Sequence, residues 1–285
     1  MPADSPLLKD VYSSSLGSDM NRKVTIQNVT FNVPTTHDAM TVDWDSIVEN
    51  YEPKTFKIFA NLLNSADFAL EVGIDASQTT FTTALLSGKL VAIEPSSRSI
   101  SYAKSILEVN PNLKNKVILI HGALSDSNED VIFGPNQKLF DDIHFNSNSV
   151  PTTVKGFTIE AIEQIAQAKI TFINMDIEGG EYIVLPAMKD WLRERKPTFL
   201  LSLHPGFLLS IKQKKRAKFL RYVKRFKEQR KIYNSIKFYK FIYDVESGKR
   251  ISSLGIFRLK FVRSKSGQYS QILCMTQEPT SKIQF

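Results

Sequence analysis

The sequence predicts an α/β fold built on a doubly wound, mostly parallel, Rossmann-like sheet with antiparallel strands at its C-terminal end. Apolar segments of strand length alternate with amphipathic segments of helical length from about residue 53 to residue 204. The strand-like segments are almost continuously apolar, as expected for parallel strands that helices cover on both faces. Right-handed crossovers would then place a ligand site at the carboxyl ends of the strands.

The chain divides into two predicted parts. Residues 1–50 form an N-terminal arm with a short strand or hairpin, because 1–23 are polar and aperiodic whereas VTIQNVTFNVP (24–34) alternates. Residues 51–285 form the main domain. Its five predicted parallel strands are 68–74, 89–95, 116–124, 170–176 and 197–204. Its predicted helices are 77–88, 96–110, 158–168, a stretch interrupted at Pro186, and a basic helix at about 211–231.

Two further segments complete the predicted main domain. Residues 125–155 carry loop-forming residues around a possible short strand, DVIFG. The tail, about 236–276, contains three strand-like runs, SIKFYKFIYDV, SLGIFRLKFV and YSQILCM. Because their links are short, we expect these strands to be antiparallel.

The positive charge is concentrated in one segment. The chain carries a net charge of +8, and residues 211–231 alone hold eleven Lys and Arg residues against one Glu, a net charge of +10. The remainder therefore has a net charge of −2. The predicted basic helix has an apolar face at Phe219, Leu220, Val223 and Phe226. It either covers the sheet with a solvated outer face or attracts an anionic surface, whether phosphorylated glycan, nucleic acid or membrane.

The single cysteine, Cys274, rules out an intramolecular disulfide, and a reducing compartment, the cytoplasm, is the simplest interpretation. No segment reaches the roughly 18–20 apolar residues of a membrane span. The first residues also lack a basic region followed by an apolar one, so we expect no secretory signal.

The first two predicted strand ends suggest a nucleoside ligand without phosphates. After the first strand, EVGIDASQTT (71–80) keeps only Gly73 of the usual dinucleotide-binding glycines. A zwitterionic ligand could still place a carboxylate at the helix start near Ser77 or Gln78. After the second strand, Glu94 precedes Pro95 and follows Glu71 by 23 positions, a spacing suited to binding ribose hydroxyls. A solvated strand-end carboxylate is the alternative for Glu94.

The last three strand ends supply the candidate chemistry. Gly122 and Ala123 are small enough for adenine to lie against the backbone. NMDIEGGE (174–181) crowds three carboxylates around two glycines, and of these Asp176, at the strand end, is best placed to face a ligand. His204 is the candidate general base, unless it merely bonds a loop. Asp176 and His204 could also hold a divalent metal, but no third ligand is evident, and we expect none.

Several motifs together resemble the FkbM family of S-adenosylmethionine-dependent methyltransferases. They span roughly residues 50–206 and are YEPKT (51–55), ALEVGIDASQTT (69–80), VAIEP (91–95), HGALSD (121–126), TIEAI (158–162) and NMDIEGGE (174–181). The acid–Glu–Gly–small–Glu pattern of the last motif is the most specific. Glu71 and Ser77 stand where family members usually carry Asp and Gly, and Ser202 replaces a frequent acid.

The resemblance implies a class I methyltransferase that transfers a methyl group from S-adenosylmethionine to a hydroxyl of a sugar or small metabolite. Asp176 and His204 would be catalytic, and Glu52, Glu178 and Glu181 would contact the substrate. Glu181 could instead be only a helix-start residue, since an acid there is favoured by the helix dipole. The implied cofactor contacts are Glu71, Gly73, Asp75, Ser77, Gln78, Thr79, Glu94, Pro95, Ala123 and Asp176.

Two other enzyme classes fit less well. A nucleic-acid base N-methyltransferase usually carries an Asn/Asp-Pro-Pro-aromatic run after the fourth strand, where this chain has DIEGG. A nicotinamide oxidoreductase would need the missing glycines. The alternative from another class is a non-catalytic protein with a methyltransferase-like body that binds anions through the basic helix.

Overall fold

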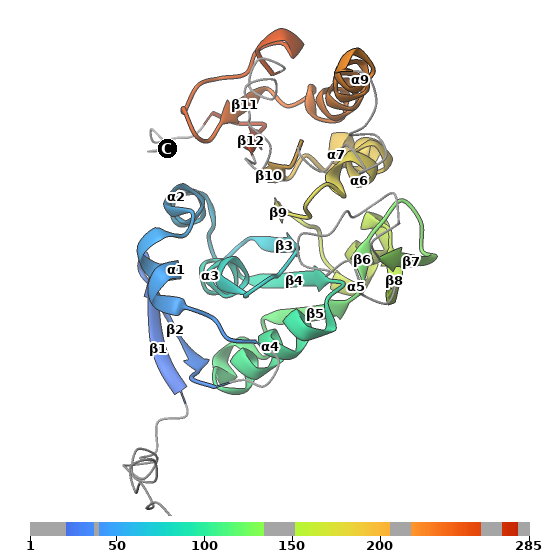
Figure 1. The fold of residues 1–285 in the computed structure, drawn as a ribbon. Helices are drawn as coiled ribbons and strands as arrows, with labels where there is room; N and C mark the ends of the chain where they lie inside the picture. The colour runs from blue at the N-terminus through green and yellow to red at the C-terminus, as the bar shows by residue number, and fades with distance from the viewer. Residues whose placement is uncertain (1–20, 37–39, 134–151, 206–217, 258–269, 279–285) are drawn as a thin grey trace, which may run out of the picture.

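The computed structural model describes residues 21–36, 40–133, 152–205, 218–257 and 270–278. Its centre is a seven-stranded sheet in the order β11-β12-β10-β9-β3-β4-β5 (Figure 1). Five strands run parallel, as predicted. They are β3 (Phe68–Val72), β4 (Lys89–Glu94), β5 (Val117–His121), β9 (Phe172–Met175) and β10 (Thr198–Leu203).

The C-terminal strands differ in part from the prediction. β11 (Phe241–Asp244) and β12 (Ser270–Met275) do pair antiparallel, but β12 also inserts between β11 and β10. Only β12 therefore opposes the parallel strands. The run SLGIFRLKFV was expected to be a strand, yet its residues 254–257 are helical and 258–262 lie outside the described residues. The pattern of apolar residues in a run this short does not distinguish a helix from a strand.

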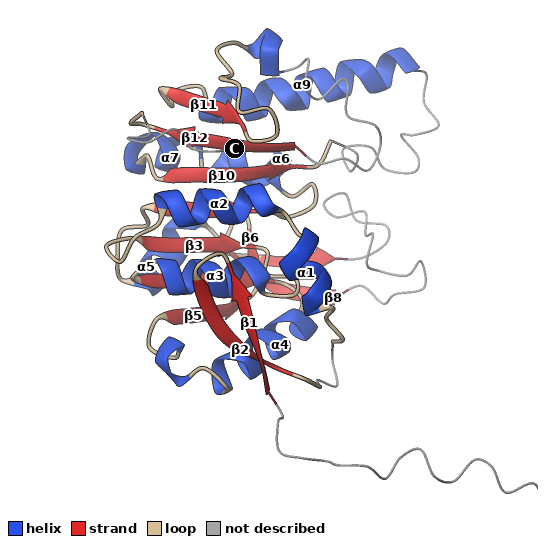
Figure 2. Cartoon of the chain, turned by 90° about the vertical axis from the view of Figure 1, so that its left-hand side faces the viewer, coloured by secondary structure: helices blue, strands red, loops and turns tan. Residues whose placement is uncertain are grey.

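Helices cover both faces of the sheet, which confirms the doubly wound arrangement. Figure 2 shows α2 (Pro53–Leu62) and α3 (Gln78–Leu86) in front of the sheet, with α5 (Ile159–Ala166) and α7 (Lys189–Arg195) behind it. Further helices in the described ranges are α4 (Ser97–Glu108), the 3-10 turn η1 (Pro111–Leu113), α6 (Glu181–Ala187) and α9 (Lys218–Ile236). Pro186 lies inside α6, and α7 follows at once.

The core has two layers because successive side chains of a buried strand point to opposite faces. Leu70 and Ile173 join the cluster beneath α5, α6, α7 and α9. Their neighbours Ala69 and Phe172 join the cluster beneath α2, α3 and α4. Continuous apolar strands are thus explained by burial on both sides.

The predicted N-terminal hairpin is present as β1 (Asn21–Ile26) and β2 (Val29–Pro34). It packs on the same cluster as α4, and Trp44, the first residue of α1 (Trp44–Asn50), donates its indole N–H to the Tyr102 hydroxyl at 2.8 Å. The domain boundary at residue 50 stays a prediction.

A small three-stranded sheet fills part of the region expected to be rich in loops. Its order is β6 (Ala123–Leu124), β8 (Thr152–Phe157) and β7 (Asp130–Phe133), and β7 matches the predicted strand DVIFG. Among the helices of the described ranges, none is long and apolar enough to cross a membrane.

Candidate active site

Four parallel strands end side by side at one edge of the main sheet. Val72 is in register with Ile93 of β4 and with Met175 of β9, and Met175 is in register with Leu201 of β10. The residues just beyond these strands are therefore neighbours, and they include Gly73, Asp176 and His204. The sequence predictions for the carboxyl edge thus converge on one region.

Strained backbone is concentrated at this edge. Seven described residues other than glycine have a positive φ, and four of them are predicted site residues. They are Glu52 (36°), Asp75 (44°), Ser77 (71°) and Glu178 (46°). Such conformations cost roughly 1–3 kcal/mol each, and they cluster where surrounding structure holds functional groups in place.

Glu94 ties the second strand end to the turn after the first. Its two carboxylate oxygens accept the backbone N–H groups of Ile74 and Ser96, each at 2.8 Å. Burial raises the pKa of Glu94 above its ordinary value, although these hydrogen bonds act in the opposite direction. The side chain therefore sits at the turn where the sequence predicted a ribose contact.

Buried polar atoms without partners mark the start of α3. Glu71 is fully buried and accepts hydrogen bonds from Thr79 Oγ1 and from Asn174 Nδ2, the latter at 2.9 Å. Burial raises its pKa to about 8. Within the described residues, no hydrogen-bond partner is present for Glu71 Oε2, Ser77 Oγ or Gln78 Oε1. Because buried polar groups are normally paired, these atoms fit a polar ligand.

Asp176 and His204 lie together at the ends of β9 and β10. His204 Nε2 is 3.3 Å from Asp176 Oδ1, and His204 Nδ1 is 3.4 Å from Glu181 Oε1. Burial lowers the pKa of His204, but the adjacent carboxylates of Glu181, Asp176 and Glu178 outweigh it and raise this pKa to about 9. Burial and the nearby carboxylates raise the pKa of Asp176 to about 7, against the opposing charge of His204.

Glu52 belongs to a network that sequence reasoning missed. Its Oε2 atom accepts from Thr55 Oγ1 at 2.9 Å and from Gln271 Nε2 at 3.0 Å. Gln271 Nε2 also lies 3.4 Å from Ser202 Oγ, so β12 meets β10 and the start of α2 here. In the sequence, Gln271 could have been noticed as the one amide side chain within the strand-like, mainly apolar run YSQILCM.

The remaining predicted contacts are spread around this centre. The carbonyl oxygen of Pro95 lies 3.1 Å from Nε2 of His121. Ala123 is 4% exposed and packs against Val154 of β8, so its predicted cofactor contact stays a prediction. The described residues contain no group of three or more His, Cys, Asp and Glu side chains that could hold a metal ion.

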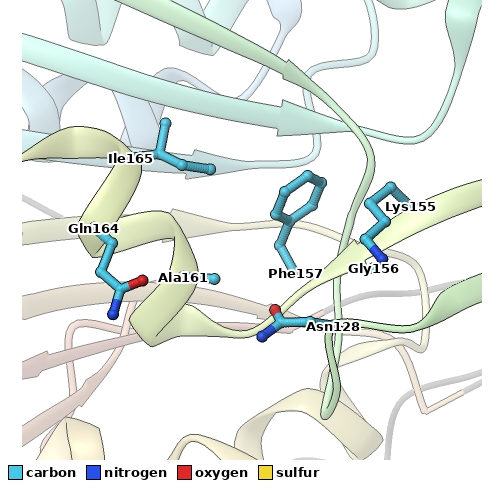
Figure 3. Close-up of a pocket in the computed structure, with 7 residues that line it drawn as sticks. All are labelled: Asn128, Lys155, Gly156, Phe157, Ala161, Gln164 and Ile165. Carbon is cyan, nitrogen blue, oxygen red and sulfur yellow. The ribbon is translucent and has the colours of Figure 1, made fainter.

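A pocket of about 400 Å³ lies elsewhere, between β8 and α5 (Figure 3). The ring of Phe157 and the side chains from α5 face one another across it. None of the predicted site residues lines this pocket, and we assign it no ligand. Its lining residues are Asn128, Lys155, Gly156, Phe157, Ala161, Gln164 and Ile165.

The chain matches a known protein family. The sequence profile of the Methyltransferase FkbM domain matches residues 67–227. No curated protein matches the chain. Among solved structures, a methyltransferase FkbM from Methylobacillus flagellatus is 13% identical, with a TM-score of 0.44, over 77% of this chain and 47% of that one. The present chain therefore spans about half the length of that protein.

Two smaller proteins with SAH bound are also similar. An O-methyltransferase from Bacillus cereus is 15% identical, with a TM-score of 0.40, over 79% of this chain and 80% of its own. A putative methyltransferase from Streptococcus mutans is 10% identical, with a TM-score of 0.41, over 77% of this chain and 94% of its own.

Proposed function

Because the chain belongs to the FkbM methyltransferase family, we propose that it methylates a hydroxyl group of a sugar or a small metabolite. It is an S-adenosylmethionine-dependent methyltransferase with the class I fold. The observation that carries the proposal is the Asp176–His204 pair, with 3.3 Å between Oδ1 and Nε2, at the ends of two adjacent parallel strands.

S-adenosylmethionine supplies a methyl group bound to a positively charged sulfur. The residues at the carboxyl edge fit such a ligand. Glu94 would accept hydrogen bonds from the ribose hydroxyls, and the unpaired atoms of Glu71, Ser77 and Gln78 would meet its polar amino-acid part. The carboxylates near Asp176 repel one another, so a cation bound among them would relieve part of that repulsion.

The transfer needs a group that takes up the hydroxyl proton. When bound, S-adenosylmethionine would supply the methyl group and retain the electron pair of the C–S bond, and the Asp176–His204 pair would take up the proton that the acceptor hydroxyl loses as its C–O bond forms. In the ligand-free protein near neutral pH, the raised pKa of His204 means that its ring already holds a proton. A bound cation beside Asp176 would lower the pKa values of both groups and leave His204 free to accept a proton.

We place the acceptor hydroxyl near the carboxylates of Glu52 and Glu178. Glu52 is held by Thr55 and Gln271, and Glu178 occupies a strained position beside the Gly179 turn. Carboxylates accept hydrogen bonds from hydroxyl groups, which agrees with a sugar or polyol acceptor. We also propose a cytoplasmic location, since a single buried cysteine suits a reducing compartment.

The experiment is a screen of hydroxyl acceptors with isotopically labelled S-adenosylmethionine, scored by the mass gain of one CH₂ unit. For an accepted substrate, His204→Ala should lower kcat by roughly 10²–10³ and leave cofactor affinity nearly intact. Asp176→Asn should damage both. Full activity in His204→Ala, with an unshifted acidic limb of the pH–rate profile, would end the base assignment.

The second candidate function is anion binding without catalysis through α9. It is favoured by the exposed side chains of Lys227, Arg230 and Lys231 on that helix. Calorimetry with S-adenosylmethionine separates the two functions, because a non-catalytic body should not bind the cofactor.

A further inference from the structure

One buried carboxylate makes three contacts with two separate segments of the proposed active site. Glu181, the first residue of α6, is 0% exposed. Its Oε2 atom accepts the backbone N–H of Gly179 at 2.6 Å, and its Oε1 atom accepts the backbone N–H of His204 at 2.6 Å. The same Oε1 atom lies 3.4 Å from the ring nitrogen Nδ1 of His204.

Neither role predicted for Glu181 from the sequence accounts for these contacts. A substrate contact would not explain the two backbone hydrogen bonds, which this carboxylate makes without any ligand. A favourable interaction with the dipole of α6 needs only an acid near the helix start. An exposed acid makes the same interaction, so the dipole does not explain why Glu181 is buried. Burying a carboxylate costs several kcal/mol unless hydrogen bonds replace its water. Here the backbone N–H groups of Gly179 and His204 replace the water around the carboxylate. Both belong to segments that carry predicted site residues.

The His204 ring lies between two carboxylates. The ring has a carboxylate at each nitrogen, with Glu181 beside Nδ1 and Asp176 beside Nε2. A carboxylate beside a ring nitrogen favours a proton on that nitrogen, unless the carboxyl group is itself protonated. Burial raises the pKa of Asp176 to about 7, so Asp176 can hold a proton toward Nε2 while Glu181 favours the ring proton on Nδ1. With its proton on Nδ1, His204 presents Nε2 to Asp176. The groups facing His204 are therefore Asp176 at the end of β9, Glu178 in the following turn and Glu181 on α6.

We propose that Glu181 is a positioning residue, which orients His204 and keeps Nε2 as the proton acceptor in methyl transfer. The proposal rests on the function proposed above, because it assigns a partner to the proposed base. In this role Glu181 acts through His204 and through the backbone of Gly179, and it needs no contact with the acceptor or the cofactor.

The test is a titration of His204 by NMR of the histidine ring protons. The chain has four histidines, and the signal lost in His204→Asn identifies the relevant one. In Glu181→Gln, the pKa of His204 should fall by about one unit or more, since a neighbouring charge is lost. With an accepted substrate, kcat should fall at least about tenfold. The acidic limb should move to lower pH, while the cofactor KM changes little.

Glu160→Gln is the matched control. Glu160 is an exposed acid in the first turn of α5, so its removal changes a helix dipole contact alone. It should leave both the His204 titration and kcat as in the wild type. If Glu181→Gln does not fold, Glu181→Asp keeps the charge but shortens its reach. Like Glu181→Gln, this variant should have a lower kcat and a lower His204 pKa than the wild type.

The outcomes separate this inference from the proposed function. If Glu181→Gln, or Glu181→Asp in its place, keeps the wild-type His204 titration and kcat, the positioning role is overturned while methyl transfer stands. If the titration shifts as expected but His204→Ala retains full methyl transfer, the base role fails and the contact between Glu181 and His204 stands.

Discussion

Gly73 and Asp176 approach each other so closely that a Cβ atom on Gly73 would lie 2.1 Å from the Asp176 carbonyl oxygen. Gly73 also has a φ of +92°, which side-chain-bearing residues rarely adopt. The backbone N–H of Asp176 donates to the carbonyl oxygen of Val72 at 2.9 Å. The turn after β3 and the end of β9 are therefore one rigid unit, and the proposed cofactor and base sites share it.

Gly73→Ala should destabilise the protein by several kcal/mol, because the methyl group meets backbone that cannot move independently. Gly255→Ala is the control, since the nearest atom to its added Cβ would be 3.7 Å away and its position is helical. That change should be neutral or stabilise the protein by up to about 1 kcal/mol. Urea unfolding measures both, and equal free energies of unfolding for the two variants would contradict the close contact.

Glu94→Ala should weaken cofactor binding by about 1.5–3 kcal/mol, the range for hydrogen bonds to a charged group. The measurement is calorimetry with S-adenosylhomocysteine, which avoids turnover. Glu108→Ala serves as the control because Glu108 is an exposed acid at the end of α4. Unchanged affinity in Glu94→Ala would remove Glu94 from the site.

Glu71→Gln should change how stability depends on pH. The folded protein holds the pKa of Glu71 at about 8, against 4.5 for the free group, so folding favours its protonated form. This contribution is fully present below pH 4.5 and is lost as pH rises through 8. The side chain of the Gln variant does not titrate. The Tm of this variant relative to that of the wild type should therefore increase as the pH is raised from 5 to 8.

The control for this pH dependence is Glu163→Gln. Burial opposes ionisation of Glu163, but hydrogen bonds from Arg195 and Trp191 lower its pKa. The stability it contributes is present above its ordinary pKa and is lost only as pH falls. Thermal unfolding should therefore show a constant Tm difference from the wild type between pH 5 and pH 8. A constant difference for Glu71→Gln as well would refute the pKa shift of Glu71.

The charged face of α9 should bind anionic surfaces without affecting catalysis. Ile232 and Ile236 are fully buried, whereas Lys227, Arg230 and Lys231 are exposed. Because the apolar face already packs on the domain, attraction must come from charge. Reversing Lys227 and Arg230 to Glu should abolish binding to anionic vesicles or RNA and spare turnover of a small acceptor.

Lys57→Glu with Lys104→Glu makes the same charge change on the opposite face of the sheet, where both residues are exposed. This pair should leave binding intact. If the wild type binds neither vesicles nor RNA at low salt, α9 is only a covering helix. Lys214 and Lys215, which the sequence also placed in the basic helix, lie outside the described residues.

The sequence by itself determined the layered α/β fold and the sheet edge at which the proposed site lies. A parallel strand buried on both faces must be apolar along its whole length, so segments such as 68–74 and 170–176 could be recognised locally. Strand order along the chain then placed Gly73, Glu94, Asp176 and His204 at carboxyl ends. The same pattern misjudged residues 254–257, because a short apolar run suits a helix or a strand equally.

Only the tertiary structure decided which distant residues meet. Gln271 bonds to Glu52, 219 positions away, because β12 inserts beside β10 rather than extending the sheet at its edge. In the sequence, Glu181 could be interpreted as an acid at a helix start. In the structure, the end of β10 places the backbone N–H of His204 within hydrogen-bond distance of its carboxylate. Local periodicity specifies which face a side chain takes, but strand pairing and core packing across the whole domain select the partner on that face.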